Sequence, residues 1–397
     1  MDVYETAIVG AGPIGCHVAR YLASKGRKVA VFEEHRTIGE PLHCAGLVTQ
    51  RVLELAGCPS EGIVQNTIYG AVIHSPGGSV LTIGGDKVHA LVIDRQKFDV
   101  SIAEKALHAG AMISLQSKIS AAKRTNEGIR LEITKNEQKT TVHCTLLIGA
   151  DGAHSHIREI FGFPKPLEQL QGISAELSEV TLDPKYVHIF VGSSIAPGFF
   201  AWVIPTNGKG TTARVGLCIG KHHTHPLPHY FTTLLQHPLL QGAMVMKRFG
   251  GSIPLGPLKK TTDNHLMLVG DAAAQVKPTS GGGLYPGLLC AEQCSSVAET
   301  AFQTQRFDEW TLRRYHVAWS KGIGRELALG MRFRGLYLQL TDNQFNKYIE
   351  KLNTRKTLET INTYGDIDYP SRLAFPLLRV VPSLLTLAPS LLKRTKP

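Results

Sequence analysis

The residues with the clearest chemical potential lie near the start of the chain, where Gly10, Gly12 and Gly15 form a GxGxxG pattern. The pattern stands between a short apolar run at 4–9 and a stretch at 14–24 with helical periodicity. In such a turn the first glycine permits the tight bend, the second lets the backbone approach a pyrophosphate, and the third lets the helix pack on the strand. Glu33 follows at the end of the next predicted strand, where a carboxylate can accept hydrogen bonds from ribose hydroxyls. These residues predict a dinucleotide-binding βαβ unit.

Two later segments carry further ligand-binding residue types. Residues 149–158 read GADGAHSHIR after a predicted strand, and residues 270–278 read GDAAAQVKP after another. Asp271 can accept a hydrogen bond from a ribityl hydroxyl, and a helix that begins near Gly282–Leu284 can direct its first N–H groups at a flavin carbonyl. Each Asp-containing segment alone also fits an ordinary turn. Together with the glycine pattern, and in this order, they favour FAD over NAD.

These motifs, with Arg95 in the sequence DRQKFD at 94–99, resemble the p-hydroxybenzoate hydroxylase group of flavoproteins. Within that group the chain is most similar to the geranylgeranyl reductase family. Residues 41–46 (PLHCAG) resemble the PxxCxG motif of that family, and residues 270–287 (GDAAAQVKPTSGGGLYPG) resemble its flavin-binding signature. The resemblance covers residues 1–300 well and the remaining helices more loosely.

The fold class that follows is α/β, with three parts. A Rossmann-like FAD-binding domain, built on a parallel sheet with helices, is expected from residues 1–66, 90–165 and 256–300. An antiparallel-sheet substrate domain is expected from residues 67–89 and 166–255, where short strands alternate with turns. A helical region is expected at 301–397.

The resemblance also implies site residues. The implied FAD contacts are Gly10, Gly12, Pro13, Ile14, Gly15, Glu33, Cys44, Ala45, Leu47, Arg95, Ile119, Asp271, Gly282, Gly283 and Leu284. The implied substrate residues are Phe200, Trp202 and Pro205, in the segment FAWVIP at 200–205, which resembles the YxWxFP motif of the family. Phe replaces the motif's Tyr and Ile replaces its Phe, so the apolar wall is kept while the phenol hydroxyl is lost.

Cys44 is the candidate catalytic residue. A cysteine is more often a small apolar filler than a reagent, but its position in PLHCAGL, soon after Glu33, predicts a thiol close to the flavin. Three roles stay open at this point: proton donation, gating of the flavin, and shaping of the pocket. No metal site is expected, because the tract His222-His223-Thr224-His225 has no acidic or cysteine residues beside it and is more typical of a solvated loop.

The function implied by the resemblance is the reduction of isolated prenyl C=C double bonds in geranylgeranyl chains, in archaea those of digeranylgeranylglycerophospholipids. The partners would be that lipid and an external electron donor. The chain has no second GxGxxG for NADPH, which favours a protein such as ferredoxin; NAD(P)H stays open, because hydroxylases of this fold use it without such a motif. The alternatives are an FAD-dependent monooxygenase or halogenase, and a flavin-containing protein that binds prenyl lipids without turnover.

Charge and composition indicate where the protein acts. The 397-residue chain has a formal net charge of +11 and neither a run of five basic residues nor a nucleic-acid motif, so an anionic membrane surface is expected in place of nucleic acid. Residues 373–392 are apolar but broken by three prolines, and Lys393, Arg394 and Lys396 follow. Such a segment either lies on a membrane surface or packs on the core as a helix hairpin. Scattered cysteines and the absence of a leader favour a cytoplasmic protein, peripherally associated with the membrane.

Overall fold

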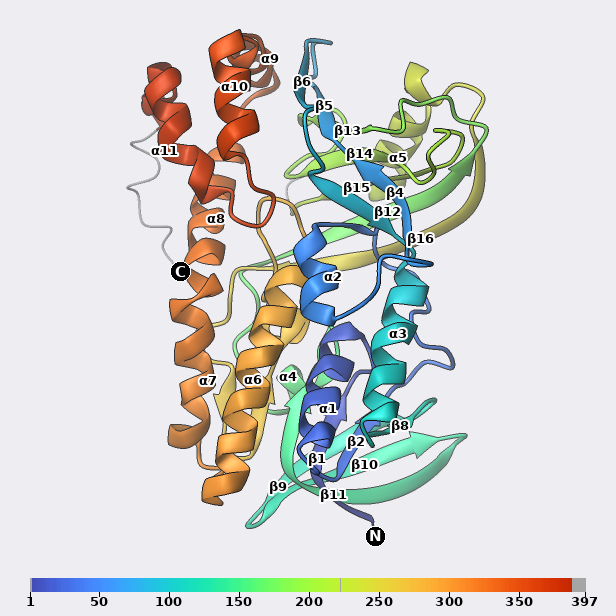
Figure 1. The fold of residues 1–397 in the computed structure, drawn as a ribbon, viewed down its shortest axis with the longest axis vertical. Helices are drawn as coiled ribbons and strands as arrows, with labels where there is room; N and C mark the ends of the chain where they lie inside the picture. Colours follow the sequence, from blue (N-terminus) through green and yellow to red (C-terminus); the bar gives the residue numbers. More distant parts are fainter. Residues whose placement is uncertain (1, 222, 388–397) are drawn as a thin grey trace.

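The computed structural model describes residues 2–221 and 223–387 (Figure 1). Two large sheets lie toward opposite ends of the long axis, and a set of long helices runs along one side of the molecule. This is the predicted combination of a Rossmann-like sheet with helices, an antiparallel sheet and a helical region near the C-terminus.

The first sheet has the strand order β17-β18-β11-β1-β2-β8, and β10 and β9 continue from β11 as an antiparallel meander. The pairs β18–β11, β11–β1, β1–β2 and β2–β8 are parallel. The strands are β1 (Asp2–Val9), β2 (Val29–Phe32), β8 (Met112–Ser114), β9 (Lys118–Thr125), β10 (Gly128–Lys135), β11 (Gln138–Gly149), β17 (Thr262–Asp263) and β18 (Leu266–Leu268).

The predicted βαβ unit is confirmed as β1, α1 (Pro13–Ser24) and β2. Helix α1 places Cys16, Val18 and Leu22 in the core because these residues recur on one face, and the chain turns after it at Gly26, where φ is +79°. On the same side of the sheet α1 packs against α3 (Arg95–His108) and α6 (Leu284–Thr304). The short α4 (His156–Ile160) follows β11.

The second sheet has the order β16-β12-β15-β14-β13-β5-β6. Its neighbouring strands are antiparallel except β13 and β5, which are parallel. The strands are β5 (Gly70–His74), β6 (Val80–Gly84), β12 (Glu168–Ser178), β13 (Tyr186–Val191), β14 (Phe200–Pro205), β15 (Ala213–Ile219) and β16 (Met244–Leu255). The strands β5 and β6 form a hairpin around the Pro-Gly-Gly turn at 76–78. The exact boundaries of the three predicted parts stay a prediction.

Strand β14 shows how this sheet divides its two faces. Ala201 and Val203 are buried under α5 (Leu227–Leu235), together with Tyr230 and Phe231 of that helix. The alternate side chains, those of Phe200, Trp202 and Ile204, lie on the opposite face because side chains of a strand alternate. The 3₁₀ turn η1 (Pro238–Leu240) follows α5.

A small third sheet connects the two large ones. It has the order β3-β7-β4, with β3 (Leu47–Val48), β7 (Ala90–Ile93) and β4 (Val64–Ile68). Helix α2 (Gln50–Ala56) lies between β3 and β4 in the sequence. The sequence did not predict this sheet as a separate element.

The helices that follow α6 are α7 (Glu309–Lys321), α8 (Ile323–Tyr337), α9 (Asp342–Leu352), α10 (Arg355–Tyr364) and α11 (Ser371–Val380), with a final 3₁₀ segment, η3 (Pro382–Leu387). Cys290, Cys294, Tyr315 and Trp319 are buried in the core, whereas Trp310 is 64% exposed.

Helix α11 has no buried residue. In the part of the chain that the structure describes, no helix is long and apolar enough to cross a membrane. The end of the predicted surface segment, with its three basic residues, lies outside the described residues.

A buried ion pair attaches the loop between α10 and α11 to the rest of the protein. The Nζ of Lys277 lies 2.7 Å from Oδ1 of Asp368, and both side chains are buried. Thr49 donates a hydrogen bond of 2.6 Å to the same carboxylate, and Arg51 lies 3.2 Å from it. The hydroxyls of Tyr285 and Tyr369 are 2.9 Å apart. The loop is therefore held by α2, by α6 and by the segment before α6.

We expect the substitution Lys277→Met to lower the free energy of unfolding by about 3 kcal/mol, because it removes one partner of a buried charge pair. In urea denaturation, Lys277→Met with Asp368→Asn should be less destabilised than the sum of the two single variants. Lys259→Met, at an exposed lysine, is the control and should change stability by less than about 0.5 kcal/mol. Equal stability of Lys277→Met and the unchanged protein would contradict this account.

Candidate cofactor and substrate site

The glycine turn after β1 combines two tight backbone contacts with one open position. Gly10 has a φ of +103°, and a side chain there would clash with the carbonyl oxygen of Ala150. A side chain at Gly15 would clash with the carbonyl oxygen of Gly10. At Gly12, by contrast, nothing lies within 4 Å of an added Cβ. Gly12 is also the N-cap of α1 and provides no capping side chain, so the helix N-terminus faces free space where a pyrophosphate fits.

Glu33 is fixed at the edge of this turn. Its Oε2 accepts a hydrogen bond of 2.8 Å from the backbone N–H of Ala11, and its Oε1 accepts one of 3.0 Å from that of His35. Ile119, also an expected FAD contact, is buried in the core beneath the first sheet, while the backbone N–H of nearby Ser117 donates to the Glu33 carbonyl. The structure thus brings the backbone near Ile119, but not its buried side chain, toward the turn.

Three expected site residues from distant segments meet beside α3. Arg95 forms hydrogen bonds of 3.2 and 3.1 Å with the carboxylate of Asp99 and interacts with Cys44. Asp271, in the turn η2 (Gly270–Ala273), has its pKa raised to about 6 by burial, while the positive charge of Arg95 acts in the opposite direction. The sulfur of Cys44 accepts a hydrogen bond of 3.3 Å from the N–H of Gly46.

The N-terminus of α6 lies next to Asp271. A Cβ added at Gly283, the N-cap of α6, would be 2.6 Å from Oδ1 of Asp271, so only glycine permits this approach. A Cβ added at Gly282 would be 2.8 Å from Cε of Lys277. No side chain caps α6. A 21-residue helix therefore directs its positive dipole end and free N–H groups at the space beside Asp271.

Arg214 of β15 positions the segment that contains Cys44. Its guanidinium donates to the carbonyl oxygens of Ala45 and Ile93, at 3.1 and 2.9 Å, although the residue is only 4% exposed. A side chain at Gly46 would clash with this guanidinium. Arg214 lies in none of the sequence motifs, but it is the one charged residue of the apolar strand ARVGLCI, and a single charge in such a strand indicates a specific role.

An aromatic wall faces this segment. Trp202 packs in one cluster with Ala45 and Leu47. Phe200 lies edge-on to Trp202, with ring centroids 6.0 Å apart, and stacks on Phe199 at 4.3 Å. The indole N–H of Trp202 is buried and has no hydrogen-bond partner among the described residues, so a ligand can supply one. Two of the three expected substrate residues therefore lie beside the expected flavin segment.

Pro205, the third expected substrate residue, is buried at the end of β14, where its carbonyl oxygen accepts a hydrogen bond of 2.9 Å from Asn66.

A polar cavity of about 280 Å³ opens between the start of α3 and the antiparallel sheet. Its lining consists of Gly39, Glu40, Leu42, Gln65, Asp94, Arg95, Gln96, Glu176, Arg214 and Lys247.

The polar groups of this region fit FAD. Three features of this region are free to contact a ligand: the open position at Gly12, the uncapped N-termini of α1 and α6, and the buried carboxylate of Asp271. A bound dinucleotide would supply the contacts that the protein itself does not make there. The N-terminus of α1 is suited to binding a pyrophosphate, and the N-terminus of α6 is suited to binding a flavin carbonyl.

Comparison with known proteins agrees with this assignment. The chain matches the FAD binding domain family over residues 3–253, which is more than half of its length. It belongs to this family of FAD-binding oxidoreductases, and FAD is its cofactor.

Relatives that align over nearly the full length of the chain indicate a more specific group within this family. The chain is 33% identical to an uncharacterised protein of Methanocaldococcus jannaschii, over 95% of each chain. It is 29% identical to the digeranylgeranylglycerophospholipid reductase of the same organism, over 100% of this chain and 98% of the relative. The resemblance indicated by the motifs is confirmed.

Solved structures show the same fold. A geranylgeranyl bacteriochlorophyll reductase-like protein from Thermoplasma acidophilum has a TM-score of 0.87 at 23% identity, covering 99% of this chain and 100% of that one. A flavin-dependent brominase has a TM-score of 0.73 at 15% identity, covering 96% and 100%.

We expect Gly12→Ala to weaken FAD binding at least tenfold (about 1.4 kcal/mol), because the methyl group occupies the space for the pyrophosphate. The FAD-free protein should keep its stability to within about 1 kcal/mol, since the φ of −66° at Gly12 suits alanine. Gly10→Ala, the matched variant, should lose about 2 kcal/mol or more through backbone strain. Flavin fluorescence titration and thermal melts measure the two effects, and unchanged affinity in Gly12→Ala would place the pyrophosphate elsewhere.

Asp271→Asn should stabilise the FAD-free protein while weakening FAD binding. The folded-state pKa of about 6 lies above the ordinary value of 3.8, so folding disfavours the ionised carboxylate. The stability associated with Asp271 is complete below about pH 4 and is lost as the pH rises through about 6. At pH 8 the variant should therefore be more stable by about 3 kcal/mol, and at pH 4 by almost nothing. Urea denaturation at both pH values checks this, and a stability gain of the same size at both would contradict it.

Proposed function

We propose that the protein reduces isolated prenyl C=C double bonds in geranylgeranyl chains, with a digeranylgeranylglycerophospholipid as its substrate. The observation that carries the proposal is the apolar wall of Phe200 and Trp202 beside the Cys44–Leu47 segment, in a chain similar over its full length to reductases named for that lipid.

The aromatic wall suits an unactivated alkene. An isolated double bond has no carbonyl oxygen to polarise, so holding it in the correct position in a dry site must supply much of the rate enhancement. Phe200 and Trp202 give the bound chain carbon surfaces, and the buried ring of Phe199 stacks behind Phe200. Phe200 has no hydroxyl group, so the proton that completes the reduction must come from another group. Bound FAD, once reduced, supplies the hydride equivalent.

We assign to Cys44 the position beside the flavin and the alkene. The N–H of Gly46 and the guanidinium of Arg95 contact its side chain, and Arg214 fixes the backbone that follows it. The thiol is therefore held in place, as a proton donor to a carbon atom requires. The remaining FAD contacts proposed are those given above from the family resemblance, with the side chain of Ile119 serving the core.

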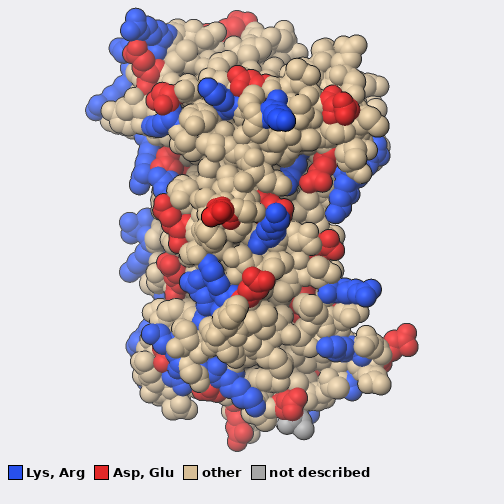
Figure 2. All heavy atoms as spheres, turned by 45° about the vertical axis from the view of Figure 1, so that its right-hand side comes forward, with Lys and Arg blue, Asp and Glu red and all other residues tan. Residues whose placement is uncertain are grey.

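The electrons reach FAD from an external donor, for which ferredoxin and NAD(P)H are the two candidates. For the location we propose the cytoplasmic side of an anionic membrane. Helix α11 supports this, because Phe375 is 63% exposed and the basic residues Arg372 and Arg379 flank it. In Figure 2, Lys and Arg side chains are interspersed with Asp and Glu over the face in view and form no broad basic patch of the kind that nucleic acid binds.

A monooxygenase or halogenase is the second candidate. Its support is the shared fold, as in the brominase, at identities that carry no further argument. The PxxCxG and SGGGLYPG segments favour the reductase.

The test is anaerobic incubation of the purified holoenzyme with digeranylgeranylglycerophospholipid and dithionite, followed by mass spectrometry. We expect a gain of about two mass units for each reduced double bond. Cys44→Ala should lower the rate about a hundredfold or more while FAD stays bound, as expected for loss of a proton donor. Cys58→Ala, a buried cysteine in the core away from this segment, is the control and should keep the rate.

Unchanged lipid in the presence of fully reduced flavin would overturn the reductase. A gain of one oxygen in air would then identify a monooxygenase, and no product under either condition would identify a lipid-binding protein. A normal rate in Cys44→Ala would remove the proton-donor role and leave the reductase standing.

A further inference from the structure

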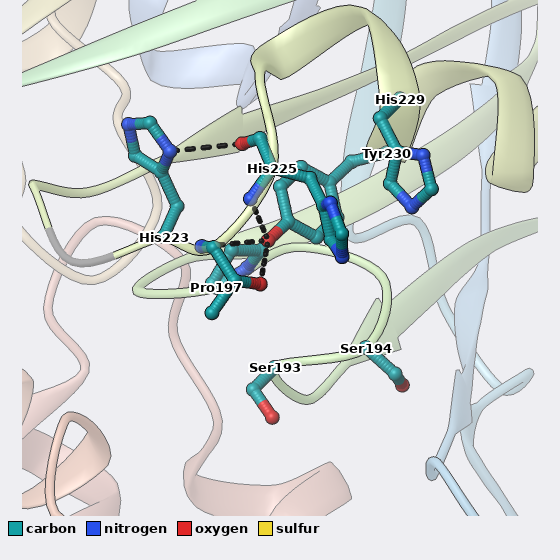
Figure 3. A pocket seen from close by; sticks show the side chains of 8 residues that line it. Ser193, Ser194, Pro197, His223, His225, His229 and Tyr230 are labelled. Atoms are coloured by element: carbon teal, nitrogen blue, oxygen red, sulfur yellow. Dashed lines mark hydrogen bonds between the residues drawn. The ribbon is translucent and has the colours of Figure 1, made fainter.

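A second pocket lies at the end of the antiparallel sheet, between the β13–β14 loop and the segment that leads into α5. Its volume is about 660 Å³, and its lining consists of Ser193, Ser194, Pro197, His223, Thr224, His225, His229 and Tyr230. Figure 3 shows the rings of His225 and His229 on one side of the pocket and Ser193 and Ser194 on the other. None of the lining residues carries a carboxylate.

The histidine side of the pocket is held by Tyr230. Its buried hydroxyl accepts hydrogen bonds of 3.3 Å from the backbone N–H groups of both Thr224 and His225. The rings of His225 and His229 lie 4.2 Å apart, centroid to centroid. Two imidazoles are thus presented together from a fixed turn.

The donor groups of this pocket have few protein partners. Within residues 2–221 and 223–387, neither ring of His225 and His229 nor the hydroxyl of Ser194 has a hydrogen-bond partner. Ser193 is engaged, since both its N–H and its hydroxyl donate to Asp342 behind the loop. The described residues contain no group of three side chains arranged to hold a metal ion. The free groups are therefore suited to an anion that accepts hydrogen bonds.

Helix α5 adds to this preference. It begins at Leu227, between the two histidines, and no side chain caps its N-terminus. The positive end of the helix dipole therefore lies at the pocket, where it favours a negatively charged group.

The pocket is continuous in sequence with the aromatic wall. The loop that supplies Ser193 and Ser194 ends at Phe199 and Phe200, the first two rings of the wall, and Trp202 leads from there to Ala45 and Leu47. The histidine side of the pocket lies on the α5 face of the sheet and the wall lies on the opposite face, so the chain of an amphiphile bound at the histidines would have to pass around this loop to reach the wall. We propose that this pocket binds a phosphate group, either the headgroup of the prenyl lipid or free phosphate. The headgroup arm of the proposal rests on the proposed function.

The test compares the holoenzyme with the His225→Ala/His229→Ala variant, and uses His108→Ala, an exposed histidine of α3, as the control. Calorimetric titration with inorganic phosphate measures the pocket without turnover. Steady-state kinetics are then measured with two substrates, a geranylgeranyl diether of glycerol phosphate and the same diether with a free glycerol hydroxyl. Both histidines are exposed, so the double variant should fold, and a thermal melt confirms this.

For a headgroup site, the double variant should raise KM for the phosphorylated lipid at least tenfold (about 1.4 kcal/mol) and leave kcat and the KM for the uncharged lipid unchanged. Loss of inorganic phosphate binding with an unchanged KM would support the phosphate site and assign it to free phosphate. If the double variant changes neither phosphate binding nor KM, the proposal is wrong. If the unchanged holoenzyme reduces neither lipid, the proposed function fails, while the titration still decides the pocket.

Discussion

The buried guanidinium of Arg214 is the interaction on which the arrangement of the site depends. A buried charge is tolerated only when its donors are satisfied, and here the partners come from four segments of the chain: the carbonyl oxygens of Ala45 and Ile93, and the side chains of Gln65 and Glu176. Because Arg214 belongs to the antiparallel sheet and Ala45 to the segment after the glycine-turn unit, one side chain fixes the distance between the aromatic wall and Cys44. Gly46 is required next to it because a Cβ would occupy the position of the guanidinium.

On the cofactor side, the protein leaves polar groups without internal partners. The N-termini of α1 and α6 have no capping side chain, and Asp271 remains buried although burial raises its pKa. Each feature costs stability in the FAD-free chain. A single ligand with a pyrophosphate and a polyhydroxylated chain meets all three needs, so folding and cofactor binding are thermodynamically linked. The apolar wall has the opposite character, and the two surfaces meet at the Cys44–Leu47 segment.

The sequence predicts those parts of the site whose residues lie close together in the chain, and it does not predict contacts between segments far apart in the sequence. The glycine turn was predictable because the three glycines, the helix after them and the acidic residue all lie within or directly after one βαβ unit, and the alternation along β14 shows directly which side chains share a face. The meeting of Cys44, Arg95 and Asp271 followed from the family resemblance and not from spacing, because long segments of chain separate them. Lys277 and Asp368 could not be paired from the sequence, since Asp368 lies in no recognisable motif and the pair forms only when the loop before α11 folds back on the segment before α6. Ile119, which the resemblance assigns to the cofactor, has its side chain in the core, so a contact with FAD there would be made by its backbone.

Strand β14 gives the clearest link between the fold and the proposed chemistry. Its inward residues Ala201 and Val203 are covered by α5, so that face stabilises the sheet, whereas Phe200 and Trp202 are free to form the wall on the other face. A shift of register by one residue would exchange the two faces and remove the wall. The same helix that covers the first face also directs its N-terminus at the histidine pocket, at the end of the sheet where the wall begins. The pocket and the wall therefore lie on opposite faces of one sheet, and the chain leading into β14 lines the first while the aromatic side chains of β14 form the second.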